Sequence, residues 1–150
     1  MNRFNSSSFF RIGLAALTIS ILVTSCAPDN EEDITLPRDK FIGTWSMSSH
    51  HTDPNQATNQ SWDLSIESYS ADGEQVMMRN FDWMGSDKAV RALVNGNNLI
   101  IQDTTINLNG GSYQTINGTG SLNGATLSFN YTSFDGITTD TATASGTEIQ

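Results

Sequence analysis

From Phe41 onward, hydrophobic and polar residues alternate with a period of two. In residues 62–66 and again in residues 127–131, an apolar side chain occupies every second position. Such alternation is typical of antiparallel strands that turn one face toward a core and the other toward water. The pattern therefore predicts an all-β domain over residues 41–150.

Turn signals divide this region into short segments. They are Asp72-Gly73, Asn95-Gly96, Asn109-Gly110-Gly111, Asn123-Gly124 and Asp135-Gly136. Residues of these types tolerate the positive φ that tight hairpins require. The strands expected between them are residues 41–49, 61–69, 74–81, 88–95, 98–106, 112–120, 121–133 (chiefly 125–133) and 137–147. Consecutive hairpins make an antiparallel eight-stranded meander, which removes its exposed edges by closing into a barrel; a β-sandwich is the alternative.

The first 25 residues differ from the rest of the chain. Arg3 and Arg11 precede a run of twelve mostly apolar residues at positions 12–23. As a helix this run would span about 18 Å, whereas the hydrocarbon core of a bilayer is about 30 Å thick. That length indicates a cleavable signal peptide over residues 1–25 and not a stable membrane span.

The single cysteine follows this leader directly. The segment Val23-Thr24-Ser25-Cys26 resembles the lipobox of bacterial lipoproteins. That resemblance implies a diacylglycerol on the Cys26 sulfur, cleavage before Cys26 and acylation (for example with palmitate) of the new amino terminus. Residues 26–40 then form an acidic tether. Its acid run resembles the signal that exports some lipoproteins to the cell surface, so we expect an outer-membrane, lipid-anchored protein, exposed on the cell surface.

Charge narrows the choice of partners. The whole chain has a formal net charge of −9. Without the leader, five basic residues remain against sixteen acidic ones, which gives −11. Such a body repels phosphate backbones and anionic lipid surfaces, so nucleic acid is excluded and membrane attachment needs the lipid. With one cysteine, neither an internal disulfide nor a cysteine-based metal cluster can form.

The start of the β region resembles a known family. Phe41-Ile42-Gly43-Thr44-Trp45 is similar to the opening Gly-x-Trp of lipocalin-like barrels. Asn80-Phe81, Gly118-Thr119-Gly120 and Leu127-x-Phe129-x-Tyr131 also resemble features of small, uncharacterised lipocalin-like lipoproteins. The resemblance implies a lipocalin-like barrel in which Trp45 closes one end as a fold residue. The second and third signature motifs of lipocalins are not visible.

The histidines and carboxylates do not form a clear metal-binding or catalytic motif in the sequence. His50-His51-x-Asp53 is the one histidine cluster, and it could hold a metal only if it formed a loop, because neighbouring strand residues point to opposite faces. A solvated loop without metal is the preferred interpretation. The chain has no Gly-x-Ser-x-Gly elbow, P-loop or His-Glu-x-x-His motif. We therefore expect neither an enzyme nor a cofactor.

An aromatic segment joins two of the expected strands. Phe81 and Trp83 lie in residues 80–85, and Tyr69 and Tyr113 could add polar tips to the same barrel mouth. These residues could bind a small apolar or glycan ligand, or Phe81 and Trp83 could simply plug the barrel. The sequence thus predicts a non-enzymatic binding module. The alternative is a solid barrel whose outer loops contact another envelope protein or inhibit an enzyme.

Overall fold

The structure is a computed structural model that describes residues 35–54, 59–108 and 113–149. Its strands are β1 (Gly43–His51), β2 (Gln60–Ser68), β3 (Gln75–Arg79), β4 (Ala89–Asn95), β5 (Asn98–Asn107), β6 (Tyr113–Asn123), β7 (Thr126–Phe134) and β8 (Thr139–Glu148). A short 3-10 helix, η1 (Asp39–Phe41), precedes β1, and another, η2 (Phe81–Trp83), joins β3 to β4. The predicted strands are confirmed, although several ends move by a few residues. No helix among these residues is long and apolar enough to cross a membrane.

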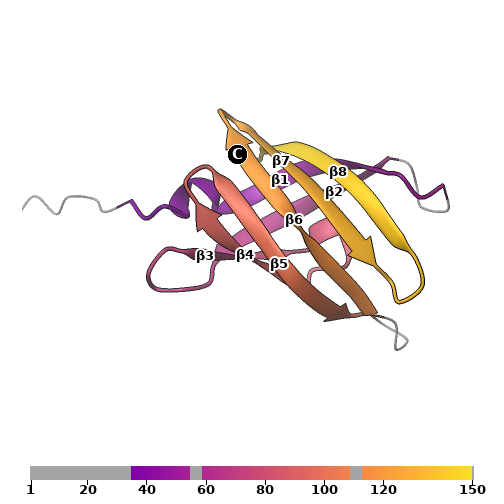
Figure 1. The fold of residues 1–150 in the computed structure, drawn as a ribbon. Coiled ribbons are helices and arrows are strands. Elements are labelled where there is room, and N and C mark those ends of the chain that lie inside the picture. Colours follow the sequence, from indigo (N-terminus) through magenta and orange to yellow (C-terminus); the bar gives the residue numbers. More distant parts are fainter. Residues whose placement is uncertain (1–34, 55–58, 109–112, 150) are drawn as a thin grey trace, which may run out of the picture. The chain divides into compact units, whose positions relative to one another are not determined.

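The strands form one closed antiparallel barrel. Each strand pairs with the next along the chain, and β8 pairs with β1 (Figure 1). The predicted meander and its closure are confirmed, and the β-sandwich alternative is wrong. Two hairpins turn on the predicted Asn-Gly pairs, where Gly96 and Gly124 have φ of 58° and 60°. Glycine adopts such angles without the steric cost that a Cβ would add. The predicted turn at residues 109–111 lies outside the described residues.

Large apolar side chains fill the barrel interior. Those that are almost completely buried are Trp45, Phe41, Phe81, Phe129, Met47, Leu64, Ile66, Met78, Leu99, Ile116, Leu127 and Val76. Burying one such side chain contributes roughly 1.5–3 kcal/mol to stability. Glycines on β6 make room for the aromatic rings: a Cβ on Gly120 would lie 2.6 Å from the Phe129 ring.

Trp45 closes one end of the barrel. Its indole Nε1–H donates a 2.9 Å hydrogen bond to the carbonyl of Phe41 in η1, and both side chains are buried. The packing begins before Phe41, because Arg38 is also buried. Trp45 is therefore a fold residue, as its position in the sequence implied.

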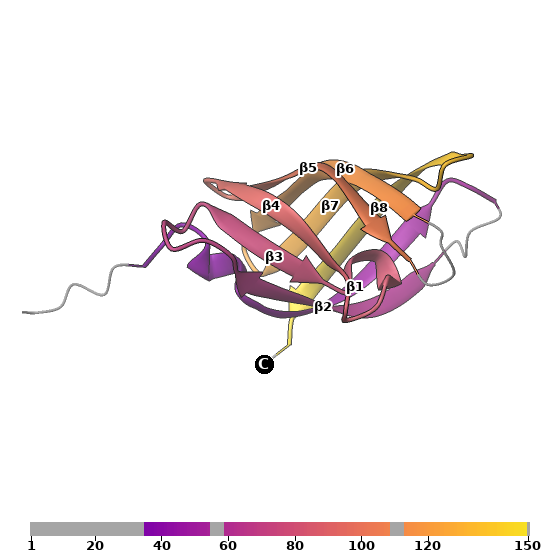
Figure 2. The same cartoon turned by 90° about the horizontal axis from the view of Figure 1, so that it is seen from below.

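The barrel has two distinct ends, named here the η1 end and the η2 end after the helices that they carry (Figure 2). Odd-numbered strands run from the η1 end to the η2 end, and even-numbered strands run back. The described chain enters at the η1 end with Thr35, and β8 finishes there. Cys26, the predicted signal peptide and most of the predicted tether lie outside the described residues.

Candidate functional site

A buried histidine lies at the η2 end of the barrel. Alternation along β1 turns Ser49 and His51 inward and His50 outward. The His51 side chain exposes 3% of its surface. The predicted solvated loop is therefore wrong for His51, because β1 continues through this residue by pairing with β8.

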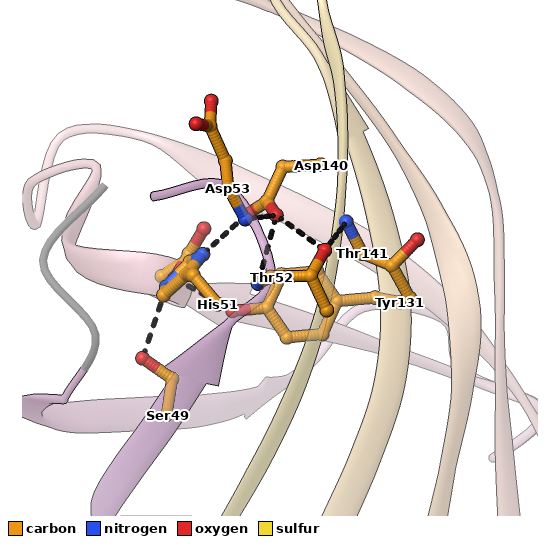
Figure 3. Close-up of polar contacts among 8 residues, drawn as sticks. Ser49, His51, Thr52, Asp53, Tyr131, Asp140 and Thr141 are labelled. Carbon is orange, nitrogen blue, oxygen red and sulfur yellow. Dashed lines mark hydrogen bonds and ion pairs between the residues drawn. The ribbon is translucent and has the colours of Figure 1, made fainter. Parts of the chain in front are cut away.

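One nitrogen of the His51 ring meets Asp140 of β8. Nδ1 lies 2.6 Å from Oδ2 of Asp140, and Oδ1 accepts hydrogen bonds from the backbone N–H groups of Thr52, at 3.1 Å, and Asp53, at 2.8 Å (Figure 3). Burial opposes ionisation of Asp140, but the hydrogen bonds from His51, Asp53 and Thr52 outweigh it and lower the pKa of this carboxyl. Asp140 is thus a carboxylate that ties the end of β1 to β8.

The other ring nitrogen meets the η2 segment. Nε2 of His51 lies 3.2 Å from Oδ1 of Asp82 and 3.1 Å from Oγ of Ser49. The hydroxyl of Tyr131 donates a 2.6 Å hydrogen bond to the same Asp82 oxygen. Burial raises the pKa of Asp82 and outweighs the opposing hydrogen bonds from Tyr131 and His51. Burial and the charge of Asp82 also raise the pKa of Tyr131.

The backbone around Asp82 adopts an uncommon conformation. Asn80, Asp82 and Trp83 have φ of 57°, 51° and 60°, in the left-handed region that residues with a Cβ seldom occupy. Side-chain hydrogen bonds hold this conformation. Asn80 donates from Nδ2 to the carbonyl of Asp63 at 2.9 Å and accepts from the backbone N–H of Gly85 at 3.0 Å. Such strained backbone persists only where surrounding contacts over-determine it, and it clusters at functional sites.

The two aromatic residues of η2 have different environments. Phe81 is fully buried, with its ring centroid 5.2 Å from that of Phe129 and 5.0 Å from that of Tyr131, in edge-to-face geometry. Trp83, two residues later, exposes 62% of its surface. Phe81 therefore plugs the η2 end, whereas Trp83 faces solvent. The strained backbone and the bonds of Asp82 separate these two roles within three residues.

The two tyrosines that the sequence grouped with this loop begin or follow strands at different ends of the barrel. Tyr69 follows β2 at the opposite, η1 end, where the Arg91 guanidinium lies 4.3 Å from its ring centroid. The grouping of Tyr69 with Phe81 and Trp83 is therefore wrong, because β2 runs away from the η2 end. Tyr113 begins β6 at the η2 end, but its side chain lies outside the described part of the structure.

The cluster has the connectivity of a proton relay, but its serine side chain is buried. Ser49, His51 and Asp140 are joined in the order of a nucleophile, a base and an orienting acid. However, Ser49 is 2% exposed, and the Asp82 carboxylate occupies the Nε2 side of the ring. In the described part of the chain, no group of three or more His, Cys, Asp or Glu residues is arranged to hold a metal ion. What the arrangement does is fix Asp82, and with it the η2 segment, onto the barrel.

Sequence reasoning named His51 only as part of a histidine cluster and missed its contacts with Ser49, Asp82 and Asp140. One signal was available: Asp140 stands in phase with the buried Ala142 and Ala144, so an acidic residue occupies a core position of β8. Extending β1 by two residues would likewise have placed His51 inward. No pattern in the sequence could link Asp82 to either strand, because that contact depends on the closed barrel.

Comparisons of the sequence with known proteins assign no role to the residues of this site. No protein-family model matches the chain, and no curated protein matches it in sequence.

Proposed function

We propose that this protein is a lipid-anchored lipoprotein of the bacterial outer membrane that acts as a non-enzymatic binding module, with Trp83 at the centre of its contact surface. The observation that carries the proposal is an exposed tryptophan between immobilised neighbours. Tryptophan is among the residues that most often dominate the free energy of binding at interfaces. A side chain on a preformed loop also loses less conformational entropy when it binds.

The filled interior favours a partner that binds from outside. Trp45, Met47, Met78, Phe81 and Phe129 are all buried in the barrel, and Phe81 plugs the end at which a ligand would enter. Of the two functions that the sequence left open, this packing supports the protein-interaction module over a ligand carrier. Exposed apolar residues at the η2 end add to the surface. Phe134, at the end of β7, is 43% exposed, and Ile137, in the following turn, is 89% exposed.

The proposed anchor is compatible with this surface. The lipid on Cys26, inferred from the lipobox resemblance, would join the domain through Thr35 at the η1 end. Trp83 lies at the other end of the barrel, which the chain's point of attachment leaves free. A partner in the envelope or outside the cell could then meet Trp83.

Site-specific photo-crosslinking in living cells tests the contact surface. A photoreactive phenylalanine analogue is placed at position 83 of the full-length protein, and at position 149 in a matched control. Ile149 suits this purpose because it is also a large exposed apolar residue, 47% exposed, but follows β8 at the η1 end. We expect a discrete crosslinked protein from position 83 and none from position 149. Equal crosslinking from both positions, or none from position 83, would contradict the proposal.

A small apolar or glycan ligand is the second candidate, because the exposed indole of Trp83 offers a face on which a sugar ring or an apolar group could stack. Native mass spectrometry of the full-length protein, released from detergent, tests it. A bound mass that is present in the wild type and absent in Trp83→Ala would favour this candidate over a protein partner.

A further inference from the structure

The ladder between β4 and β5 is incomplete. β5 extends from Asn98 to Asn107, but its pairing with β4 ends at Ala92↔Ile101. On their other sides both strands remain paired: β4 with β3 as far as Ala89, and β5 with β6 as far as Asn107. Residues 89–91 of β4 and 102–107 of β5, all of them described, therefore each have one backbone edge without a strand partner. These two edges are named here the seam.

A β-bulge separates the two strands. The register of β5 against β6 shifts between Ile101 and Thr104, where the pairing with β4 stops. Bulges of this kind bend a strand and end its pairing, and they are often found beside functional sites. The bend leaves a hollow of about 540 Å³ on the outside of the barrel, lined by both edges of the seam, including Ala89 and Arg91 of β4 and Gln102–Thr105 of β5. Ligand-binding clefts commonly have volumes of about 300–1,000 Å³.

The charged side chains of the hollow are already engaged. The Arg91 guanidinium lies over the Tyr69 ring, and Asp103 accepts a 2.8 Å hydrogen bond from the Asn117 side chain. They also have opposite signs, so the hollow favours neither an anion nor a cation. Of the main-chain groups, the Gln102 carbonyl already accepts a 2.8 Å hydrogen bond from Oγ1 of Thr104. The other N–H and C=O groups that face the seam have no strand partner there. The chemistry that satisfies such groups is another extended polypeptide backbone.

We propose that the seam binds an extended segment of a partner protein, which adds to the free edge of β5 as a further β-strand. This inference rests on the proposed function and names its partner as a polypeptide. The seam opens toward the η2 end, and residues 84–88 lead from Trp83 directly into Ala89. The seam and Trp83 therefore lie at the same end of the barrel. Backbone pairing supplies affinity, and Trp83 adds a side-chain contact at the same end.

The test uses defined peptides and the full-length lipidated protein in detergent. Peptides are selected from a random phage-displayed library, synthesised, and measured by fluorescence anisotropy. The matched control is the same peptide with alternate backbone nitrogens methylated, which removes hydrogen-bond donors and leaves every side chain in place. We expect methylation to weaken binding by about tenfold or more, because two or three main-chain hydrogen bonds are lost.

Amide exchange measured residue by residue locates the binding. We expect peptide to slow exchange in residues 89–91 and 102–107 and nowhere else in the barrel. Failure to select any peptide, binding that methylation does not weaken, or a seam that peptide leaves unprotected would overturn the inference. Protection that appears without peptide and grows with protein concentration would also overturn it, because a second copy of the chain would then be the occupant.

The variant Trp83→Ala separates this inference from the proposed function. Seam protection together with weaker binding to Trp83→Ala supports both. Seam protection with unchanged binding to Trp83→Ala supports the seam and contradicts the role of Trp83. Peptides that depend on Trp83 but leave the seam unprotected support the proposed function and contradict the seam.

Discussion

At the scale of single residues, the two carboxyl groups that contact the His51 ring have pKa values shifted in opposite directions. Asp140 receives hydrogen bonds from backbone N–H groups, a hydroxyl and the imidazole, which together stabilise its charge. Asp82 is also buried, and the hydrogen bonds that it accepts from the Tyr131 hydroxyl and the His51 ring do not outweigh its loss of water. The pKa of Asp140 is therefore lowered and that of Asp82 is raised. The contacts from His51 and Tyr131 hold the buried carboxyl of Asp82, the residue before Trp83, in place even though its burial opposes ionisation.

The substitution Asp82→Asn should stabilise the protein at neutral pH. A raised folded-state pKa means that the contribution of Asp82 is fully present below its unfolded pKa, about 3.9, and is lost as pH rises through the folded-state pKa. Asparagine keeps an acceptor for Tyr131 and removes the buried charge. We expect a gain of about 1 kcal/mol at neutral pH, the usual scale for one buried hydrogen-bonding group, which shrinks toward zero near pH 4. Urea unfolding across this range measures it.

Two control variants distinguish the cause. Asp63→Asn removes a charge from the exposed face of β2 and should not reproduce the pH-dependent gain. Asp140→Asn should have the opposite sign, with a loss of about 1–3 kcal/mol at neutral pH, because an amide cannot accept hydrogen bonds from all the donors that the Asp140 carboxylate serves. Because the pKa of Asp140 is lowered, its contribution is present above the unfolded pKa and is lost as pH falls through the folded-state value. A destabilised Asp82→Asn at neutral pH would show that the attraction between Asp82 and His51 outweighs the cost of burial.

At the scale of elements, η2 combines a plug and an exposed contact within three residues. Its N-cap Asn80 is left-handed and fixed by two side-chain hydrogen bonds. Phe81 enters the core, Asp82 reaches His51 and Tyr131, and Trp83 turns out to solvent. A regular strand would send Phe81 and Trp83 to the same side, since they are two residues apart. The left-handed backbone is what separates them.

Alanine substitutions at these two positions should therefore differ sharply. We expect Phe81→Ala to lose about 3–5 kcal/mol of unfolding free energy, as is usual for a buried aromatic residue. Trp83→Ala should change stability by no more than about 0.5 kcal/mol, as for most surface substitutions. Denaturant unfolding of both variants makes the comparison. A comparable loss in Trp83→Ala would mean that Trp83 packs against the barrel and is not a free contact residue.

At the scale of the whole molecule, the net negative charge and the proposed lipid anchor would complement each other. After cleavage before Cys26, the protein would carry sixteen acidic and five basic residues, so it would be soluble and repelled by anionic lipid. Acyl chains on Cys26 would overcome that repulsion, because each buried methylene contributes about 0.8 kcal/mol to membrane binding.

Replacing Cys26 with serine should release the protein from membranes. Serine offers no thiol for the diacylglycerol, so we expect the Cys26→Ser protein in the soluble fraction, without the mass of the acyl chains. Cell fractionation and intact-mass measurement detect both changes. Ala27→Ser is the control: it introduces the same residue at the neighbouring position and leaves the Cys26 thiol in place. The Ala27→Ser protein should remain in the membrane fraction. A Cys26→Ser protein that stays in the membrane would show that another feature holds it there.

Much of the fold was predictable because strand periodicity and turn chemistry are local properties. Alternation in residues 62–66 and 127–131 identified inward-facing positions, and the Asn-Gly pairs at residues 95–96 and 123–124 placed two hairpins. The candidate site was less predictable. Trp83 was identified because it lies in a loop rich in aromatic residues. That Trp83 faces solvent while Phe81 is buried depends on backbone angles, which the pattern of hydrophobic residues does not encode. The grouping with Tyr69 failed because it ignored the direction of β2.

The sequence by itself predicted the meander order of the strands and the inward positions within residues 62–66 and 127–131, because hairpin turns and alternation depend on residues that are near one another in the chain. It left the closure of the meander open between a barrel and a sandwich, because closure pairs β1 with β8. The tertiary structure alone decided which polar residues meet inside. Asp82, His51 and Asp140 come from three distant segments and approach only when β8 closes on β1. It also decided where the ladder opens, because the bulge in β5 depends on its pairing with both neighbours. Contacts between residues far apart in the sequence therefore fix the Trp83 loop and leave the seam open, both at the η2 end of the barrel.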